Sequence, residues 1–306
     1  MVRTWRPPWP LSVRLTLAAH RRGTGDPTHR VAADGALWRA SRTPCGPGTV
    51  RIAVRPAEGA VHATAWGPGA EWLLAALPAL LGAEDDDSGF APAHPSLHTA
   101  HARLRGLRIG RTDRVLEALL PAVLEQKVVG REAWRAWRWL LRRYGEPAPG
   151  PAGGPAPGPV PEGMYVIPPP RVWRQIPSWD WHRAGVEAVR ARTIAGAALV
   201  ADRLEGLPSA EADRRLRTLP GVGAWTSAEV RQRAHGDADA VSVGDYHLPG
   251  IVGWALTGRK VDDAGMLELL VPYAGHRHRV TRLLELSGMG PPRRGPRMAP
   301  RDYRAI

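Results

Sequence analysis

The chain of 306 residues contains a single cysteine, Cys45. One thiol cannot form an intramolecular disulfide, and it cannot supply the ligands of a structural zinc site or an iron–sulfur cluster. Cys45 lies in the sequence TPCGPG, which is typical of a turn, and no candidate base lies nearby in the sequence. We therefore favour a turn residue over a catalytic thiol.

A long apolar run is also missing. The stretch LLAALPALL at residues 73–81 is interrupted by Pro78 and is too short to cross a bilayer, which needs about 20 apolar residues. The N-terminal segment begins with arginines, prolines and tryptophans and lacks the apolar centre and the cleavage site of a signal peptide. These features predict a cytoplasmic protein without a membrane-spanning segment.

Lysine is almost absent as well, since Lys127 and Lys260 are the only lysines among the 42 Lys and Arg residues. The formal net charge of +13 suits a polyanionic partner such as nucleic acid. However, abundant Arg, Ala, Gly and Pro are also typical of a GC-rich genome, which raises the arginine content of any protein. The charge therefore supports nucleic-acid binding only weakly.

Alternating apolar and polar positions predict a β-rich N-terminal region. Within residues 11–66 the segments LSVRLTLAA, TVRIAVRP and AVHATAW alternate as half-buried strands do. An apolar stretch at residues 71–81 then predicts a helix. The acidic run EDDDSG at residues 84–89 is interpreted as a solvated loop rather than as a metal site.

Helical periodicity dominates from residue 111 onward. One apolar face is formed by Val115, Leu116, Leu119, Leu120, Val123 and Leu124. Pro121 lies inside this pattern and predicts a kink or a break between two helices. The next segment, REAWRAWRWLLRRYG, predicts a helix that ends at Gly145. At least two of its tryptophans, Trp134, Trp137 and Trp139, are expected in the core. Further helices are expected at residues 182–204, 210–219, 225–234, 264–270 and 277–286, with Ser209 as an N-cap.

The order of these patterns predicts an α+β fold with segregated elements. A β-rich N-terminal domain, residues 1–104, precedes an all-helical domain, residues 105–290. A Pro- and Gly-rich segment at residues 146–170 is expected to form a long loop within the helical domain. The basic residues 291–306 are expected to form a poorly ordered tail.

The sequence LPGVG at residues 219–223 joins two expected helices and is the first element that points to chemistry. Two glycines that bracket one apolar residue allow a tight turn with positive φ. Val222 is expected to point inward, while the amides of Gly221, Gly223 and Ala224 face outward at the start of a helix. Bare donors at the positive end of a helix dipole suit a phosphate.

The residues that follow this hairpin make the interpretation more specific. The second helix is expected to end near Gly236, an extended stretch occupies residues 240–243, and the segment GDYHL at residues 244–248 opens another helix. This combination resembles the helix-hairpin-helix superfamily of base-excision DNA glycosylases, which carries its catalytic aspartate at this place. The β-rich residues 11–66 resemble the N-terminal domain of one branch, the bacterial 3-methyladenine DNA glycosylase II enzymes.

The resemblance extends over most of the chain. Residues 119–133 resemble a family segment in which Gln126 and Lys127 would lie at the minor groove of DNA, with Lys127 at the position of the intercalating residue. Residues 183–198 resemble the helix before the hairpin, and residues 273–284 resemble the closing helix of the family. The implied partner is double-stranded DNA with damaged bases, and the implied protein is a cytoplasmic, nucleoid-associated monomer.

The resemblance assigns the catalytic role to Asp245. Cleavage of an N-glycosidic bond develops positive charge on the sugar, which a carboxylate beside C1′ stabilises while it orients the attacking water. Asp245 also fits the role of a helix N-cap, and the two roles are compatible. Relatives that also cleave the DNA strand carry a lysine nucleophile where this chain has Trp225, which cannot form a Schiff base. The resemblance therefore implies simple hydrolysis of alkylated purines, of the 3-methyladenine and 7-methylguanine class.

The same resemblance implies an aromatic pocket for the extruded base. Trp225 and Tyr273 match pocket positions, and an aromatic ring binds an electron-poor alkylated base much as it binds a cation. Glu229 stands where the branch often has a tyrosine, and it would either favour a cationic base or be a solvated surface residue. No metal site is expected. The one ion that the resemblance implies is a monovalent cation at hairpin carbonyl groups, here those of Thr218, Leu219, Gly221 or Gly223.

Two other functions stay open at this point. The hairpin and the basic surface would also suit a non-catalytic protein that binds damaged DNA, although such a protein would be free to lose Asp245. The other alternative is a helix-hairpin-helix glycosylase for mismatched or oxidised bases, against which the β-rich N-terminal domain and Trp225 both count. A structural role without nucleic acid is the least favoured.

Overall fold

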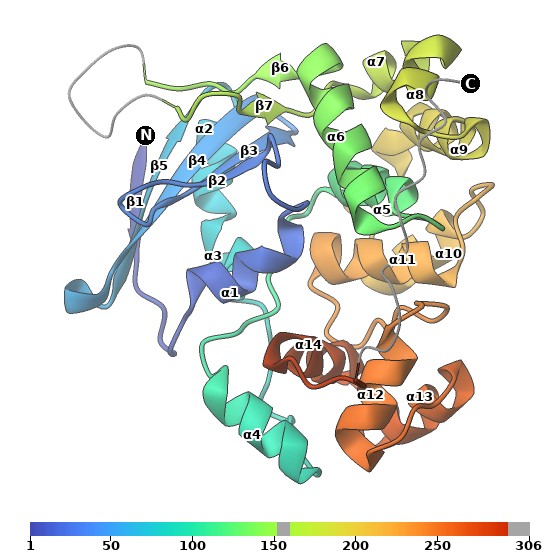
Figure 1. Ribbon diagram of the computed structural model, residues 1–306. Coiled ribbons are helices and arrows are strands. Elements are labelled where there is room, and N and C mark those ends of the chain that lie inside the picture. Colours follow the sequence, from blue (N-terminus) through green and yellow to red (C-terminus); the bar gives the residue numbers. More distant parts are fainter. Residues whose placement is uncertain (152–159, 293–306) are drawn as a thin grey trace.

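The computed structural model describes residues 1–151 and 160–292 and has the predicted α+β architecture. An antiparallel sheet occupies the N-terminal part, and helices form nearly all of the remainder (Figure 1). The expected order, a β-rich part followed by a helical part, is therefore confirmed. Part of the predicted loop, residues 152–159, and most of the predicted tail, residues 293–306, lie outside the described residues.

Five antiparallel strands form the N-terminal sheet, in the spatial order β1-β5-β4-β3-β2. The strands predicted at TVRIAVRP and AVHATAW are confirmed as β4 and β5. Gly59 lies at the turn between them in a left-handed conformation, with φ of 56°. The strands are β1 (Val2–Trp5), β2 (His29–Val31), β3 (Leu37–Thr43), β4 (Gly46–Arg55) and β5 (Ala60–Trp66), with a separate pair, β6 (Glu146–Pro147) and β7 (Tyr165–Val166).

The segment LSVRLTLAA is helical and is not the predicted strand. Residues Val13–Leu17 form α1, and Ala18–His20 continue as the 3-10 turn η1. Ser12 begins α1, because its side chain accepts a hydrogen bond from the Leu15 backbone N–H at 3.3 Å. The buried side chains are those of Val13, Thr16 and Leu17. Over so few residues this helical spacing cannot be told from an apolar–polar alternation.

Helices fill most of the chain after the sheet (Figure 1). Each helix expected from the periodicity is present, although residues 71–81 and 182–204 each divide into shorter helices. None of the described helices is long and apolar enough to cross a membrane. The helices before the loop are α2 (Ala70–Ala75), α3 (Leu77–Leu80), α4 (Pro95–Arg103), α5 (Val115–Leu124) and α6 (Gly130–Tyr144). Those after it are α7 (Pro170–Gln175), α8 (Ser178–Ala184), α9 (Ala188–Leu199), α10 (Ser209–Leu216), α11 (Ala224–Val230), α12 (Leu248–Thr257), α13 (Asp263–Leu270) and α14 (Arg277–Ser287). The remaining short turns are η2 (Pro56–Glu58), η3 (Ala201–Arg203), the π-helical η4 (Arg231–His235) and η5 (Val271–Tyr273).

Two predictions at helix boundaries need correction. Helix α5 continues through Pro121, so of the predicted kink or break between two helices, the break does not occur. Ser209 is the first residue of α10 rather than its N-cap, and its hydroxyl donates to Asp237. A serine near the start of a helix can cap it or can donate to a distant side chain, as Ser209 does to Asp237. The sequence alone does not distinguish these two roles.

The apolar side chains gather in separate cores. One lies between the sheet and helices α1 to α3, and a second lies among α5, α6, α9 and the hairpin. Trp137 is buried in the second core, and Trp134 and Trp139 pack partly buried against it, as predicted. A third core joins α4 to α12 and α14, although α4 falls within the predicted N-terminal domain of residues 1–104.

The acidic run at residues 84–89 contributes to this packing. Asp85 forms an ion pair with Arg279 of α14 at 2.6 Å, and the two side chains are 1% and 5% exposed. The interpretation of the run as a solvated loop is therefore wrong for Asp85. A buried carboxylate is tolerated here because the guanidinium lies against it.

Candidate active site and nucleic-acid interface

The segment LPGVG joins α10 to α11 and forms the predicted hairpin. Gly221 has a left-handed backbone with φ of 86°, which glycine adopts without strain. Val222 points inward, since only 6% of its surface is exposed, whereas Gly223 and Ala224 are exposed. Gly223 begins α11 without a side-chain cap. The first amides of this helix therefore keep their hydrogen-bonding capacity for an outside acceptor.

Two side chains from other elements hold the turn of the hairpin. Thr193 of α9 donates to the Pro220 carbonyl at 3.1 Å. A Cβ on Gly221 would lie 2.1 Å from the same hydroxyl oxygen, so this close approach requires glycine. Gln126 donates from Nε2 to the Gly221 carbonyl and to the Thr226 hydroxyl, both at 2.8 Å. The structure thus brings the predicted Gln126 to the hairpin.

Lys127 lies beside this contact and has an unusual backbone. Its φ is 56°, which is one of two positive values among the described residues other than glycine. A left-handed conformation costs a residue with a side chain about 1–2 kcal/mol, and strain of this kind is frequent at functional sites. Lys127 is exposed, and its neighbour Gln126 contacts the hairpin, so the two predicted DNA-binding residues adjoin the hairpin turn.

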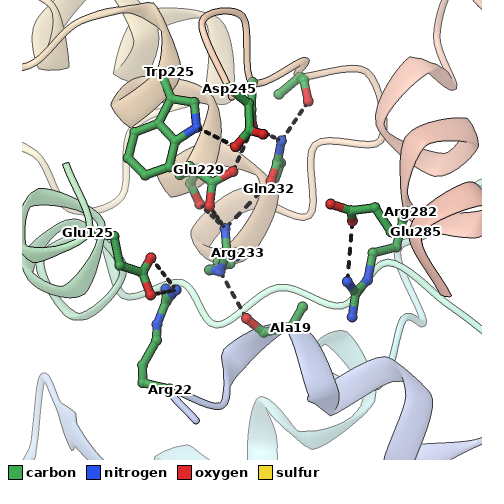
Figure 2. Close-up of polar contacts among 12 residues, drawn as sticks. Ala19, Arg22, Glu125, Trp225, Glu229, Gln232, Arg233, Asp245, Arg282 and Glu285 are labelled. Carbon is green, nitrogen blue, oxygen red and sulfur yellow. Dashed lines mark hydrogen bonds and ion pairs between the residues drawn. The ribbon is translucent and has the colours of Figure 1, made fainter. Parts of the chain in front are cut away.

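Asp245 lies just before α12, and three hydrogen bonds fix its carboxylate. Oδ1 accepts the backbone N–H groups of His247 at 2.7 Å and Leu248 at 2.9 Å. The predicted N-cap role of Asp245 needs correction, because His247 is the N-cap of α12 and Asp245 lies two residues before it. Oδ2 accepts the indole N–H of Trp225 at 3.2 Å (Figure 2). Each carboxylate oxygen has two acceptor positions. One position on Oδ2 therefore stays available for a water molecule or a ligand.

Glu229 of α11 is not a solvated surface residue, because its side chain is 13% exposed. Oε2 accepts a hydrogen bond from Arg233 at 2.8 Å, and Oε1 accepts one from the Ser242 hydroxyl at 2.6 Å. The charge of Glu229 is thus balanced by a guanidinium, and both oxygens are engaged. Direct contact between Glu229 and a base stays a prediction.

Tyr273 lies apart from Trp225 and Asp245. It is 2% exposed, its hydroxyl is hydrogen-bonded to His94, and its ring lies 6.5 Å from that of Phe90. In the described part of the chain, no hydrogen bond or ring contact joins Tyr273 to the other predicted pocket residues. The structure places it in the third core, and its role in a base pocket stays a prediction.

Sequence reasoning missed a group of ion pairs that Figure 2 shows below Trp225 and Asp245. Arg22, which follows η1, pairs with Glu125 at 2.9 Å. Arg233 donates to the Ala19 carbonyl at 2.9 Å and pairs with Glu229 at 2.8 Å. Burial lowers the pKa of Arg233, but the charges of Glu229 and Glu125 outweigh it and raise the pKa. These contacts join the N-terminal part to the hairpin helix over sequence separations that no local motif reveals.

No protein-family model and no curated protein matches this chain, but solved structures match nearly all of it. The 3-methyladenine DNA glycosylase from Archaeoglobus fulgidus is 15% identical with a TM-score of 0.73, over 94% of this chain and 98% of that one. MBOgg1, in complex with a low-affinity DNA ligand, is 15% identical with a TM-score of 0.70, over 92% and 93%. The apo form of the 8-oxoguanine glycosylase/lyase of Clostridium acetobutylicum is 11% identical with a TM-score of 0.67, over 93% and 95%.

The chain therefore has the fold of the helix-hairpin-helix DNA glycosylases. Each match covers more than nine tenths of both chains, so it includes the N-terminal sheet. The same N-terminal domain accompanies structures named for 3-methyladenine and for 8-oxoguanine. This corrects the expectation that the domain is specific to the 3-methyladenine branch, and it no longer counts against an oxidised-base enzyme.

Proposed function

We propose that the protein is a monofunctional DNA glycosylase that hydrolyses the N-glycosidic bond of alkylated purines, of the 3-methyladenine and 7-methylguanine class, in base-excision repair. The observation that carries the proposal is the placement of Asp245. Its carboxylate follows a helix-hairpin-helix element, is fixed by three hydrogen bonds and keeps one acceptor position on Oδ2. The fold shared with solved DNA glycosylases supports the same class of reaction.

In the proposed reaction, the bond between C1′ of the deoxyribose and the base nitrogen breaks, and the base leaves with the bonding electrons. The sugar develops oxocarbenium character, which the Asp245 carboxylate stabilises. A water molecule that donates a hydrogen bond to Oδ2 then adds to C1′, and its proton passes to the carboxylate or to solvent. An N-alkylated purine is already a cation, so it leaves as a neutral base without prior protonation.

The absence of strand cleavage in this proposal rests on Trp225. Cleavage through a covalent intermediate needs an amine that attacks C1′ and forms a Schiff base. Trp225 instead presents an indole N–H that is bound to Asp245. Within the described residues, the partners of the Asp245 carboxylate are this indole and two backbone amides, and none is a nucleophile.

The proposed partner is double-stranded DNA from which the damaged base is extruded. The exposed amides at Gly223 and Ala224 suit a backbone phosphate, and Lys127 would occupy the space that the base leaves. A lysine at that place also adds a charge contact, so that affinity falls as salt rises. We expect the enzyme to act as a monomer in the cytoplasm, associated with the nucleoid.

A monovalent cation at the hairpin is a further part of the proposal. The carbonyls of Leu219 and Gly223 each accept one backbone hydrogen bond, and that of Gly221 accepts Gln126. Each keeps a second lone pair, so these oxygens fit a cation that Gln126 would neighbour. No group of three or more His, Cys, Asp or Glu side chains in the described chain is arranged to hold a metal ion.

The test compares base release from methylated duplex DNA by the unmodified protein and by Asp245→Asn, with and without alkali. Asparagine keeps an acceptor oxygen for the backbone N–H groups of His247 and Leu248, so the variant should fold and bind duplex while release falls at least about 100-fold, as expected for loss of the charged group. Asp202→Asn, an exposed aspartate in η3, is the matched control and should retain full release.

Three results would each overturn part of the proposal. Strand breaks without alkali would contradict the monofunctional assignment. Duplex binding without any base release, from methylated or oxidised DNA, would favour the non-catalytic binding protein. Release of 8-oxoguanine but of no methylpurine would replace the lesion class while keeping the role of Asp245.

A further inference from the structure

One face of α6 covers the segment at residues 21–28, which joins η1 to β2. Trp134 of α6 lies against Gly23, where a Cβ would be 2.3 Å from the indole ring. One turn further along the helix, Arg138 donates to the Thr24 carbonyl at 3.1 Å. Residues 21–28 and α6 therefore form one continuous surface.

Three arginines of this surface are held by backbone carbonyl groups of the same segment. Arg21 donates from Nε to the Gly23 carbonyl at 3.1 Å. Arg30 of β2 donates from Nη1 to the Asp26 carbonyl, and Arg138 is the third. A guanidinium has five N–H donors, so each of these groups keeps donors for an outside acceptor. The carbonyl groups fix the positions of the guanidinium groups without neutralising their charges.

Arg142 adds a fourth positive charge. It is exposed and lies four residues after Arg138, on the face of α6 opposite to the buried residues of the helix. Burial lowers the pKa of Arg30, and the charges of Arg142 and Arg21 lower it further against the opposing charge of Asp26. We refer to the four residues Arg21, Arg30, Arg138 and Arg142 as the α6 patch.

The α6 patch differs from other exposed arginines because it has no carboxylate beside it. Arg215 of α10, for example, lies 3.7 Å from Glu211 on its own helix. Among the residues that the structure describes, no guanidinium of the α6 patch forms an ion pair. Asp26 is buried, and its carboxylate accepts the backbone N–H groups of Arg22 and Thr28. Positive charges gathered without counter-charges raise the local potential and attract a polyanion.

We propose that the α6 patch binds backbone phosphates of the duplex on one side of the lesion, and so extends the DNA interface well beyond the hairpin. This inference rests on the proposed function, from which it takes duplex DNA as the partner. Guanidinium groups that are held in place and keep free N–H donors suit phosphate oxygens. Contacts of this kind fix the position of the protein on DNA without reading its sequence.

The direction of α6 gives the distance of these contacts from the lesion. The helix begins at Gly130, three residues after Lys127, which adjoins the hairpin turn. With a rise of 1.5 Å per residue, Arg138 and Arg142 lie about 12 Å and about 18 Å along the helix from its first residue. At about 3.4 Å per base pair, a duplex beside α6 would bring phosphates about four to six base pairs from the lesion to the α6 patch.

The test is a thermodynamic cycle between the α6 patch and the DNA backbone. Each duplex carries one abasic-site analogue that marks the lesion. Neutral methylphosphonate linkages replace the phosphates about four to six base pairs away on the 5′ side, on the 3′ side or on neither side. Arg138→Gln combined with Arg142→Gln should weaken binding to the fully charged duplex and reduce the slope of log Kd against log salt concentration by about two. On the duplex that is neutral on one of the two sides, this variant should bind as the unmodified protein does.

Arg103→Gln combined with Arg105→Gln is the matched control. It removes two exposed arginines at the end of α4 and just after it, and Figure 1 shows α4 at the opposite end of the molecule from α6. The net charge falls equally, but the salt slope should stay nearly unchanged. Arg142→Gln alone breaks no hydrogen bond within the described chain, so it should keep the melting temperature and lower the slope by about one.

The outcomes separate this inference from the proposed function. An unchanged salt slope in the variants of α6, or an equal loss in the control, would overturn the inference and leave the α6 patch to solvent or to an acidic protein. Weakening that persists whichever side of the duplex is neutral would overturn it as well. Because binding needs no bond cleavage, a protein that releases no base would refute the proposed function while the cycle still reports where the duplex lies.

Discussion

The indole N–H of Trp225 donates to Oδ2 of Asp245 at 3.2 Å. Trp225 lies in the first turn of α11, the helix whose exposed N-terminal amides would bind a phosphate. This hydrogen bond therefore connects the proposed phosphate site to the carboxylate that would face the sugar. Oδ1 is held independently, by the backbone of the helix that follows. Removal of the indole donor should consequently change the position of Oδ2 while the two Oδ1 hydrogen bonds at the start of α12 persist.

Trp225→Phe keeps an aromatic ring and removes this donor. A hydrogen bond to a charged group contributes about 1.5–3 kcal/mol, so single-turnover base release should fall about 10- to 100-fold. The melting temperature should change little, because the Oδ1 bonds persist. Trp179→Phe, at a tryptophan of α8 that is 64% exposed, should leave release unchanged. If Trp225→Phe releases the base as fast as the unmodified protein does, the indole N–H contributes nothing to the reaction and only the aromatic ring of Trp225 matters.

The hairpin glycines offer a matched pair of substitutions. At Gly221, φ is 86° and a Cβ would lie 2.1 Å from the Thr193 hydroxyl oxygen. At Gly223, φ is −98° and a Cβ would meet no atom within 4 Å. Gly221→Ala should therefore cost roughly 2–4 kcal/mol of unfolding free energy, and Gly223→Ala less than about 0.5 kcal/mol. Chemical denaturation checks both, and similar losses would contradict this description of the turn.

The parts of the site that the sequence predicted are those set by local structure. The hairpin needs only two glycines and an inward valine, and Asp245 follows it after one helical segment and a short extended stretch. Gln126 was placed by resemblance, and its contact with Gly221 agrees with that placement. Strand β4 and strand β5 were visible for a similar reason, since a two-residue alternation over seven or more positions is seldom produced by a helix.

The parts that sequence reasoning missed depend on long-range contacts. Arg22 and Glu125 are separated by 103 residues, so neither has a local pattern that identifies the other. The assignment of α1 as a strand failed because five residues are too few to separate the two periodicities.

His278 on α14 should make stability depend on pH. Burial and the charges of Arg282, Arg233 and Arg279 hold the pKa of His278 well below its ordinary value of 6.5. The unfolded chain therefore binds a proton below pH 6.5 that the folded chain does not. The unfolding free energy should fall as the pH drops from 7 toward 5, by about 1.4 kcal/mol per pH unit from this residue.

Urea denaturation at pH 7, 6 and 5 measures this dependence. His278→Gln removes the titrating ring, so its slope below pH 6.5 should be smaller than that of the unmodified protein, whatever the absolute stability of the variant. His182 of α8 is exposed and stays hydrated in both states, so His182→Gln is the control. An unchanged slope in His278→Gln would contradict a neutral buried His278.

Lys127 combines backbone strain with a proposed role in DNA, and two substitutions separate these effects. Lys127→Ala and Lys127→Gly remove the same amino group, but only glycine relieves the left-handed backbone at φ of 56°. Lys127→Gly should therefore be more stable than Lys127→Ala by about 1 kcal/mol. Both should reduce base release from duplex DNA to a similar extent and flatten the dependence of binding on salt by about one ion. If the alanine variant is the more stable, the strain is absent. If both retain the release rate and salt dependence of the unmodified protein, Lys127 does not enter the DNA, and the space left by an extruded base must be filled by another side chain.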